Sequence, residues 1–113
     1  FQLTGSLNIK ETSTNYQKIQ SSGVVYTTLF DFSTGSYNGF IGKYTIVSGS
    51  NVRAGQYMSA WVNNQIIETD TSTGDIGSTT AVVFQSSLAG TNMVVEVYTP
   101  AAGWTIKMLA TYI

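Results

Sequence analysis

The sequence predicts an all-β fold, an antiparallel β-sandwich or jelly-roll-like arrangement of about seven to nine short strands. Apolar residues recur at every second position in most segments, and turn residues interrupt them at intervals of roughly ten residues. No segment has the apolar period of an amphipathic helix longer than a turn. All 113 residues are expected to form one domain, a fragment or C-terminal module of a longer chain.

The N-terminal region divides into a strand and an irregular segment. Residues 2–10 place Leu3, Leu7 and Ile9 on one side of a predicted strand. Residues 11–22 are polar and lack a clear period, so they are expected to be irregular. The first strongly alternating strand follows this segment.

The remaining strands are separated by short polar turns. They are expected at residues 23–32, 39–47, 56–62, 65–70, 79–86, 93–98 and 104–113, with the segments SGSNVRAG and TPAAG as turns. Tyr57, Ser59 and Trp61 share one face of their strand, and we expect Trp61 in the core. Asn63 and Asn64 then suggest a two-residue type I′ turn, because asparagine tolerates the positive φ that this turn requires.

Composition restricts the possible functions. Charged residues make up 10% of the chain, its net charge is −1, and it contains neither cysteine nor histidine. The missing histidine removes the commonest general base and metal ligand, so we expect no catalysis and no cofactor. The cations are scattered along the sequence, which argues against nucleic-acid binding; they are Lys10, Lys18, Lys43, Arg53 and Lys107. No apolar stretch is long enough to span a bilayer, and the N-terminus does not resemble a signal peptide.

Three acids in the segment ETDTSTGD are the only candidate metal ligands. Glu68 and Asp70 point to the same face of a strand, and Asp75 in the loop could complete an oxygen cage for Ca²⁺. The alternative is a solvated hairpin loop in which the aspartates accept backbone N–H bonds. A glycosidase pair would require two carboxylates flanking the scissile bond, and the positions of the acids do not favour one.

Aromatic residues are the better candidates for binding. They form 12% of the chain, and tyrosine and tryptophan offer flat apolar surfaces with a polar tip, suited to sugar rings or protein contacts. Those at or beside turns give the candidate ligand or receptor contacts, Tyr37, Asn38, Tyr98 and Trp104. The alternative for each ring is that it packs over the end of a strand.

Several strands are apolar on both faces. The runs VVYTTLF, AVVF and MVVEV have no clean polar side, which indicates central strands of a sandwich or a second face buried by a partner subunit. Small β domains without disulfides and with few charges need stability from a tight core or from assembly. We expect a homo-oligomer, with a trimer favoured.

The C-terminal half resembles the β-rich terminal modules of bacteriophage tail, fibre and other virion structural proteins. The matching residues within 52–113 are Arg53-Ala54-Gly55, Trp61, the run from Asp70 to Gly77, and the run from Gly103 to Lys107. The resemblance implies a trimeric structural module of the virion that contacts other virion proteins and a host-surface glycan or protein, and it implies no catalytic residues.

Two hypotheses therefore remain from the sequence. The first is a non-enzymatic virion module that oligomerises through an apolar sheet face and attaches to the host through its loops. The second is a carbohydrate-binding module or lectin-like domain of a larger secreted protein, which would be a monomer with a row of exposed aromatic rings.

Overall fold

The computed structural model describes residues 13–113, and within this range the chain forms six strands and no helix. These strands are β1 (Ser13–Ser33), β2 (Gly39–Ser48), β3 (Asn51–Val62), β4 (Gln65–Ser72), β5 (Val83–Ala89) and β6 (Asn92–Tyr112). All pairs are antiparallel, in the order β1-β6-β2-β3-β4, and β5 also pairs with β6. The predicted all-β class is confirmed. No helix in the described range could cross a membrane.

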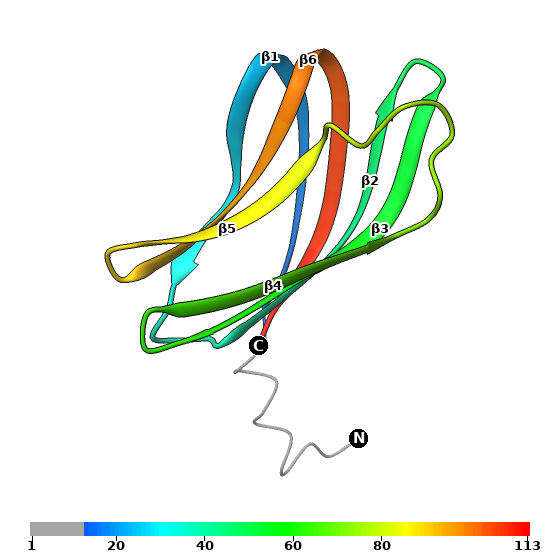
Figure 1. Cartoon of the computed structure of the whole chain (residues 1–113). Helices are drawn as coiled ribbons and strands as arrows, with labels where there is room; N and C mark the ends of the chain where they lie inside the picture. The colour runs from blue at the N-terminus through cyan, green and yellow to red at the C-terminus, as the bar shows by residue number, and fades with distance from the viewer. Residues whose placement is uncertain (1–12) are drawn as a thin grey trace, which may run out of the picture.

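The two longest strands bend, so that one sheet folds into two facing layers (Figure 1). The first half of β6 pairs with β5 and the second half of β1, and we call these segments the small layer. The second half of β6 pairs with the first half of β1 and with β2, and β3 and β4 complete the large layer. The bend coincides with a shift in the β1–β6 register between Gln20 and Ser22. Gly103, beside it, has a φ of 90°, which glycine adopts without strain.

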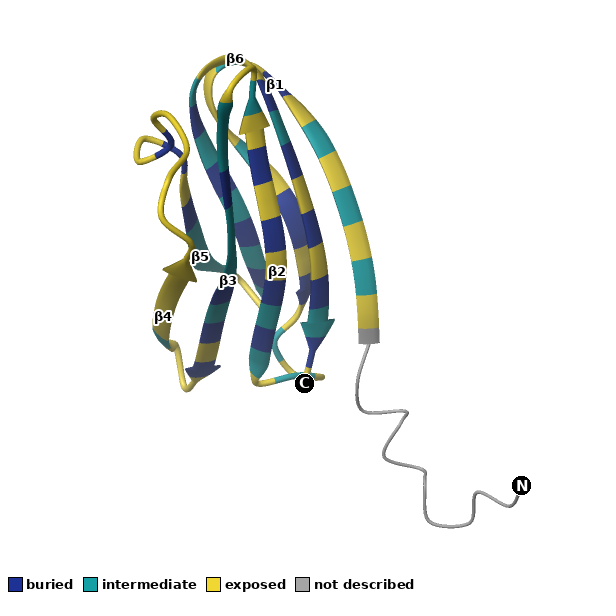
Figure 2. Cartoon of the chain, turned by 90° about the vertical axis from the view of Figure 1, so that its right-hand side faces the viewer, coloured by how far each residue is buried: buried dark blue, intermediate teal, exposed yellow. Residues whose placement is uncertain are grey.

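The core between the layers is rich in aromatic rings. Buried residues alternate with half-buried or exposed ones along β2 and most of β6, the pattern of strands with one face in the core (Figure 2). Tyr44 of the large layer and Phe84 of the small layer have ring centroids 4.4 Å apart. The hydroxyls of Tyr57 and Ser86 are hydrogen-bonded at 2.7 Å across the same gap. Apolar packing and these polar links therefore hold the two layers together.

The β3–β4 hairpin agrees with its sequence pattern. Tyr57, Ser59 and Trp61 lie on one face of β3 and are all buried. Asn63 and Asn64 connect the strands with φ values of 50° and 65°, so the predicted two-residue turn is confirmed. This hairpin could be predicted because buried and outward residues alternate along β3 and because two asparagines mark the turn.

The segment 11–22 is not irregular, because residues from Ser13 onward belong to β1. Gln17 and Ile19 on its inner face are only half-buried, since β1 is an edge strand. Because Gln17 on the inner face is polar, the sequence here does not alternate between apolar and polar residues, and the strand was not predicted. The strand predicted at 2–10 lies outside the described residues.

The turn predicted at TPAAG is also wrong, because β6 runs through it without ending. A β-bulge and a left-handed glycine let the strand bend while its pairing with β1 resumes. Similarly, the segment VRAG belongs to β3. Residues 79–82 form a turn ahead of β5, closed by the Val82 N–H donating to the Thr79 carbonyl at 3.0 Å. Longer strands thus replace several short ones, giving six in residues 13–113 in place of the expected seven to nine.

Candidate functional site

The predicted contact residues do not form one site. Tyr37 is half-buried against Tyr112, with ring centroids 5.4 Å apart, and the neighbouring Asn38 is exposed and donates its side-chain N–H to the Trp61 carbonyl at 3.2 Å. Trp104 is 7% exposed. Trp104 is therefore not an exposed contact residue. It is buried within β6 beside the bend, and not over the end of a strand as the alternative had it. Only Asn38 of this group is fully exposed, so the β1–β2 loop offers little aromatic surface.

The three candidate acids are held apart by different partners. Glu68 accepts the backbone N–H of Ser86 at 3.4 Å, and the Thr79 hydroxyl donates to Asp75. Asp70 accepts the Tyr44 hydroxyl. Among residues 13–113, no three acidic side chains cluster in a way that could hold a metal ion. Glu68 and Asp70 on β4 and Asp75 in the loop after it are therefore separate hydrogen-bond acceptors.

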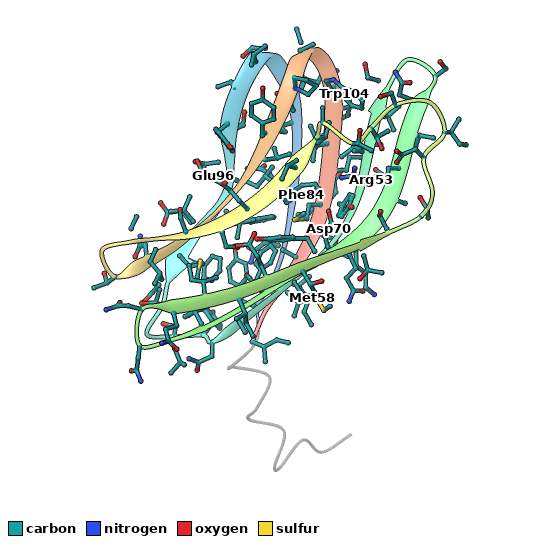
Figure 3. All side chains as sticks on the ribbon, in the orientation of Figure 1. Arg53, Met58, Asp70, Phe84, Glu96 and Trp104 are labelled. Carbon is teal, nitrogen blue, oxygen red and sulfur yellow. The ribbon has the colours of Figure 1, made fainter. Side chains whose placement is uncertain are left out.

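Arg53 is a buried cation that ties the large layer to the turn before β5 (Figure 3). Its guanidinium donates to the carbonyls of Thr79 and Val82, each at 3.0 Å, and to the Tyr44 hydroxyl at 3.2 Å. The Asp70 carboxylate lies 3.8 Å away and accepts the Tyr44 hydroxyl at 2.7 Å. Burial, reinforced by this bond, raises the pKa of Tyr44 to about 12. Every donor here has a structural partner, so the cluster stabilises the fold and offers no free reactive group.

The outer face of the small layer carries an exposed apolar row. Val83, Tyr98 and Tyr26 are directly paired across β5, β6 and β1, and the two tyrosine rings lie 5.1 Å apart. Val24 is the next outward residue of β1 and is 69% exposed. We call Val24, Tyr26, Val83 and Tyr98 the tyrosine face. It lies on the three strands whose sequences lacked a polar side.

A second apolar surface lies on the outer face of the large layer. It is a shallow groove of about 400 Å³ at the end of the sheet where the chain ends at Ile113. We call it the apolar groove; its outward lining residues are Ile41, Met58, Ala60, Ile67 and Ile113. Ile67 on the edge strand β4 is 74% exposed, the highest value among the described large apolar residues. This groove therefore leaves apolar side chains from three strands and the C-terminal residue in contact with water.

The lysines of residues 13–113 are not scattered on the folded chain. Lys18, Lys43 and Lys107 are all exposed on the outer face of the large layer, on the adjacent strands β1, β2 and β6. Their positions in the sequence gave no sign of this, because the three strands are far apart along the chain. The tyrosine face and the apolar groove were also not predicted as surfaces. Period two within QYMSAWV placed Met58 on the face opposite Trp61, whereas VVYTTLF is apolar on both faces and gave no outward side for Tyr26.

No protein-family model matches this sequence, and no curated protein shows significant sequence similarity to it. Solved structures of similar fold include two phage tailspikes. The tailspike of Acinetobacter baumannii phage AM24 aligns over 93% of this chain and 26% of its own, with 8% identity and a TM-score of 0.47. The tailspike gp49 of Acinetobacter baumannii bacteriophage Fri1, a capsular polysaccharide depolymerase, aligns over 92% of this chain and 18% of its own, with 10% identity and a TM-score of 0.51.

This chain therefore spans about a quarter or less of the tailspikes it matches. At such low identity the likeness shows the fold alone. The second tailspike supports an all-β module of this architecture as part of a much longer phage protein.

Proposed function

We propose that this chain is a non-enzymatic structural module of a bacteriophage tail appendage, which assembles with copies of itself and helps the particle attach to a host surface. Two uncovered apolar surfaces, the tyrosine face and the apolar groove, carry this proposal. The fold shared with part of a phage tailspike supports the proposal that the module belongs to a phage tail appendage. The motifs within 52–113 agree with this.

The two surfaces suit a threefold assembly. In a ring of three, each copy uses one patch toward one neighbour and a different patch toward the other. The tyrosine face and the apolar groove are different in shape and lie on the outer faces of different layers. We propose that the tyrosine face of one copy packs into the apolar groove of the next, which would remove Tyr26 and Ile67 from water.

Point substitutions test the two surfaces separately. Tyr26→Ser and Ile67→Ser should each convert the assembly to monomers, because each removes apolar area from one side of the same contact. Val47→Ser is the matched control, since Val47 is 38% exposed on the outer face of β2 and belongs to neither surface. Sedimentation equilibrium gives the masses, and circular dichroism checks folding. Folded Tyr26→Ser and Ile67→Ser variants of unchanged mass would contradict the proposal.

Cross-linking tests the head-to-tail arrangement. Because the chain contains no cysteine, a single introduced thiol is unique. With a short bismaleimide, a mixture of Val83→Cys and Ile67→Cys chains should cross-link, whereas either chain alone should not. A strong product from Val83→Cys alone would instead indicate a twofold contact between tyrosine faces.

The carbohydrate-binding module is the second candidate. The exposed Tyr26 and the half-buried Tyr98 lie one row from Gln85 and Glu96, whose side chains are hydrogen-bonded at 3.2 Å. Such a row could stack on and hydrogen-bond to a sugar. This candidate requires a monomer whose binding to a glycan array is lost in Tyr26→Ser, an outcome that the assembly proposal does not predict.

A further inference from the structure

Three of the four basic residues within 13–113 lie close together on the outer face of the large layer. Lys18 on β1 lies directly opposite Lys107 on β6, and Lys43 lies on β2, the next strand. Tyr16 and Leu109 form the neighbouring row with Lys43 and are 59% and 47% exposed. We call these five residues the lysine face.

No acid in residues 13–113 neutralises these lysines. The one ion pair there joins Arg53 and Asp70. Asp31 and Glu96 lie on the small layer, where each accepts a hydrogen bond from an amide side chain of its own layer. Like charges placed directly opposite each other across strands destabilise a sheet. Folding therefore does not account for the lysine face, and an anionic partner would.

The surface beside Lys43 and Lys107 is hollow and partly apolar. A depression of about 220 Å³ is lined on its outer side by Tyr16, Lys43, Thr45, Lys107 and Leu109. The tyrosine ring offers a flat apolar surface, and the ammonium and hydroxyl groups around it can donate hydrogen bonds. A pyranose ring carrying a carboxylate combines an apolar C–H face with a negative edge and matches this combination.

We propose that the lysine face binds an acidic saccharide chain, with one sugar ring against Tyr16 and carboxylates near Lys18, Lys43 and Lys107. This inference rests on the attachment role proposed above and names the class of receptor. Nucleic acid is less favoured, because tight binding to phosphates uses many more basic contacts than three. A second copy is less favoured as well, because Asp31 and Glu96, the acids on the small layer, each already accept a hydrogen bond.

The experiment uses the whole 113-residue chain and three probes. These are a hexamer of α-1,4-linked galacturonic acid, maltohexaose as the neutral control of equal length, and a twelve-nucleotide oligo-dT. Isothermal titration at pH 7 should show binding of the galacturonate hexamer and none of maltohexaose. Affinity should fall as sodium chloride is raised from 20 to 300 mM, because salt screens exposed charges.

Variants locate the binding. The double variant Lys18→Gln/Lys107→Gln should weaken binding of the galacturonate hexamer by about tenfold, about threefold for each exposed charge contact. Tyr16→Ser should weaken it with both lysines kept, and Lys107→Arg should retain it. The control Asp31→Asn also changes the net charge, but Asp31 lies on the small layer and belongs to none of the named surfaces, so this variant should leave the affinity within about twofold.

Four outcomes would overturn the proposal. They are equal binding of maltohexaose, tighter binding of oligo-dT than of the galacturonate hexamer, unchanged affinity in the double lysine variant, and no binding at all.

Light scattering on the same samples distinguishes a failure of this proposal from a failure of the proposed assembly. A monomer that binds the acidic hexamer through its lysines would contradict only the assembly, and a trimer that ignores the hexamer would contradict only this site. If the lysine variants dissociate into monomers, the lysine face would instead be a contact between copies of the chain.

Discussion

Trp61 joins the strand β3 to the aromatic core. It is 5% exposed and its ring centroid lies 5.5 Å from that of Phe32 on β1. Replacing it with alanine removes this contact and leaves a cavity, so Trp61→Ala should lower the free energy of unfolding by about 3–5 kcal/mol. Chemical denaturation of this variant and of Val62→Ala measures the effect. Val62 is the exposed neighbour, and its truncation should cost less than about 0.5 kcal/mol. Equal stability of Trp61→Ala and the wild-type chain would place the ring outside the core.

Buried tyrosines should make the fold sensitive to alkali. Burial raises the pKa of Tyr44 and of Tyr112 to about 12, and it also raises the pKa of Tyr57. The unfolded chain loses these protons near pH ~10, whereas the folded chain retains them. Stability is therefore complete below pH ~10 and falls between about pH 10 and 12, by about 1.4 kcal/mol per pH unit for each tyrosine.

Tyr112→Phe isolates one of these tyrosines while keeping its ring. Denaturation midpoints measured at several pH values should fall less steeply above pH ~10 in this variant than in the wild-type chain, with little difference at pH ~7. Identical alkaline slopes for the two proteins would show that Tyr112 titrates alike in both states.

Single residues differed in how well the sequence predicted them. Trp61 could be placed in the core because its strand alternates cleanly and ends at a recognisable turn. Trp104 could not, because its burial depends on the bend in β6, which brings the segment after Gly103 back over the core. Tyr98 was predicted beside a turn and instead lies within a strand, half-buried against Tyr26.

At the scale of elements, Arg53 holds β3 to the turn at residues 79–82. A lysine at this position keeps the charge but cannot donate to the carbonyls of Thr79 and Val82 and to Tyr44 in the same forked geometry. Arg53→Lys should therefore lower the free energy of unfolding by about 3 kcal/mol, since buried hydrogen bonds to a charged group are lost. Chemical denaturation of this variant and of the surface control Lys107→Arg measures the effect. Equal stability of the two variants would show that the hydrogen bonds of Arg53 do not stabilise the fold.

Hairpins were predictable and the bent strands were not. The β3–β4 turn depends on two neighbouring asparagines, so its signal is local. The bend needs a register shift in the pairing of β1 with β6, which are distant in sequence. The lysine face depends on the same non-local pairing, because Lys18 and Lys107 meet only once the two strands are in register. Sequence periodicity assigns faces to strands, but it does not say which strands are neighbours.

At the scale of the molecule, the fold places apolar surface on the outside of both layers. The tyrosine face covers β5, β6 and β1, and the apolar groove covers β2, β3 and β4. A monomer would expose both to water, which favours association. The resemblance noted within 52–113 implied a β-rich phage module, and part of a phage tailspike has a similar all-β fold.

Sedimentation equilibrium of the 113-residue chain from about 1 to 100 µM tests self-association most directly. A mass three times the 12.2 kDa of one copy, held across the upper part of that range, is the predicted result. A constant 12.2 kDa at every concentration would mean that the exposed valine, tyrosine and isoleucine side chains have some other partner.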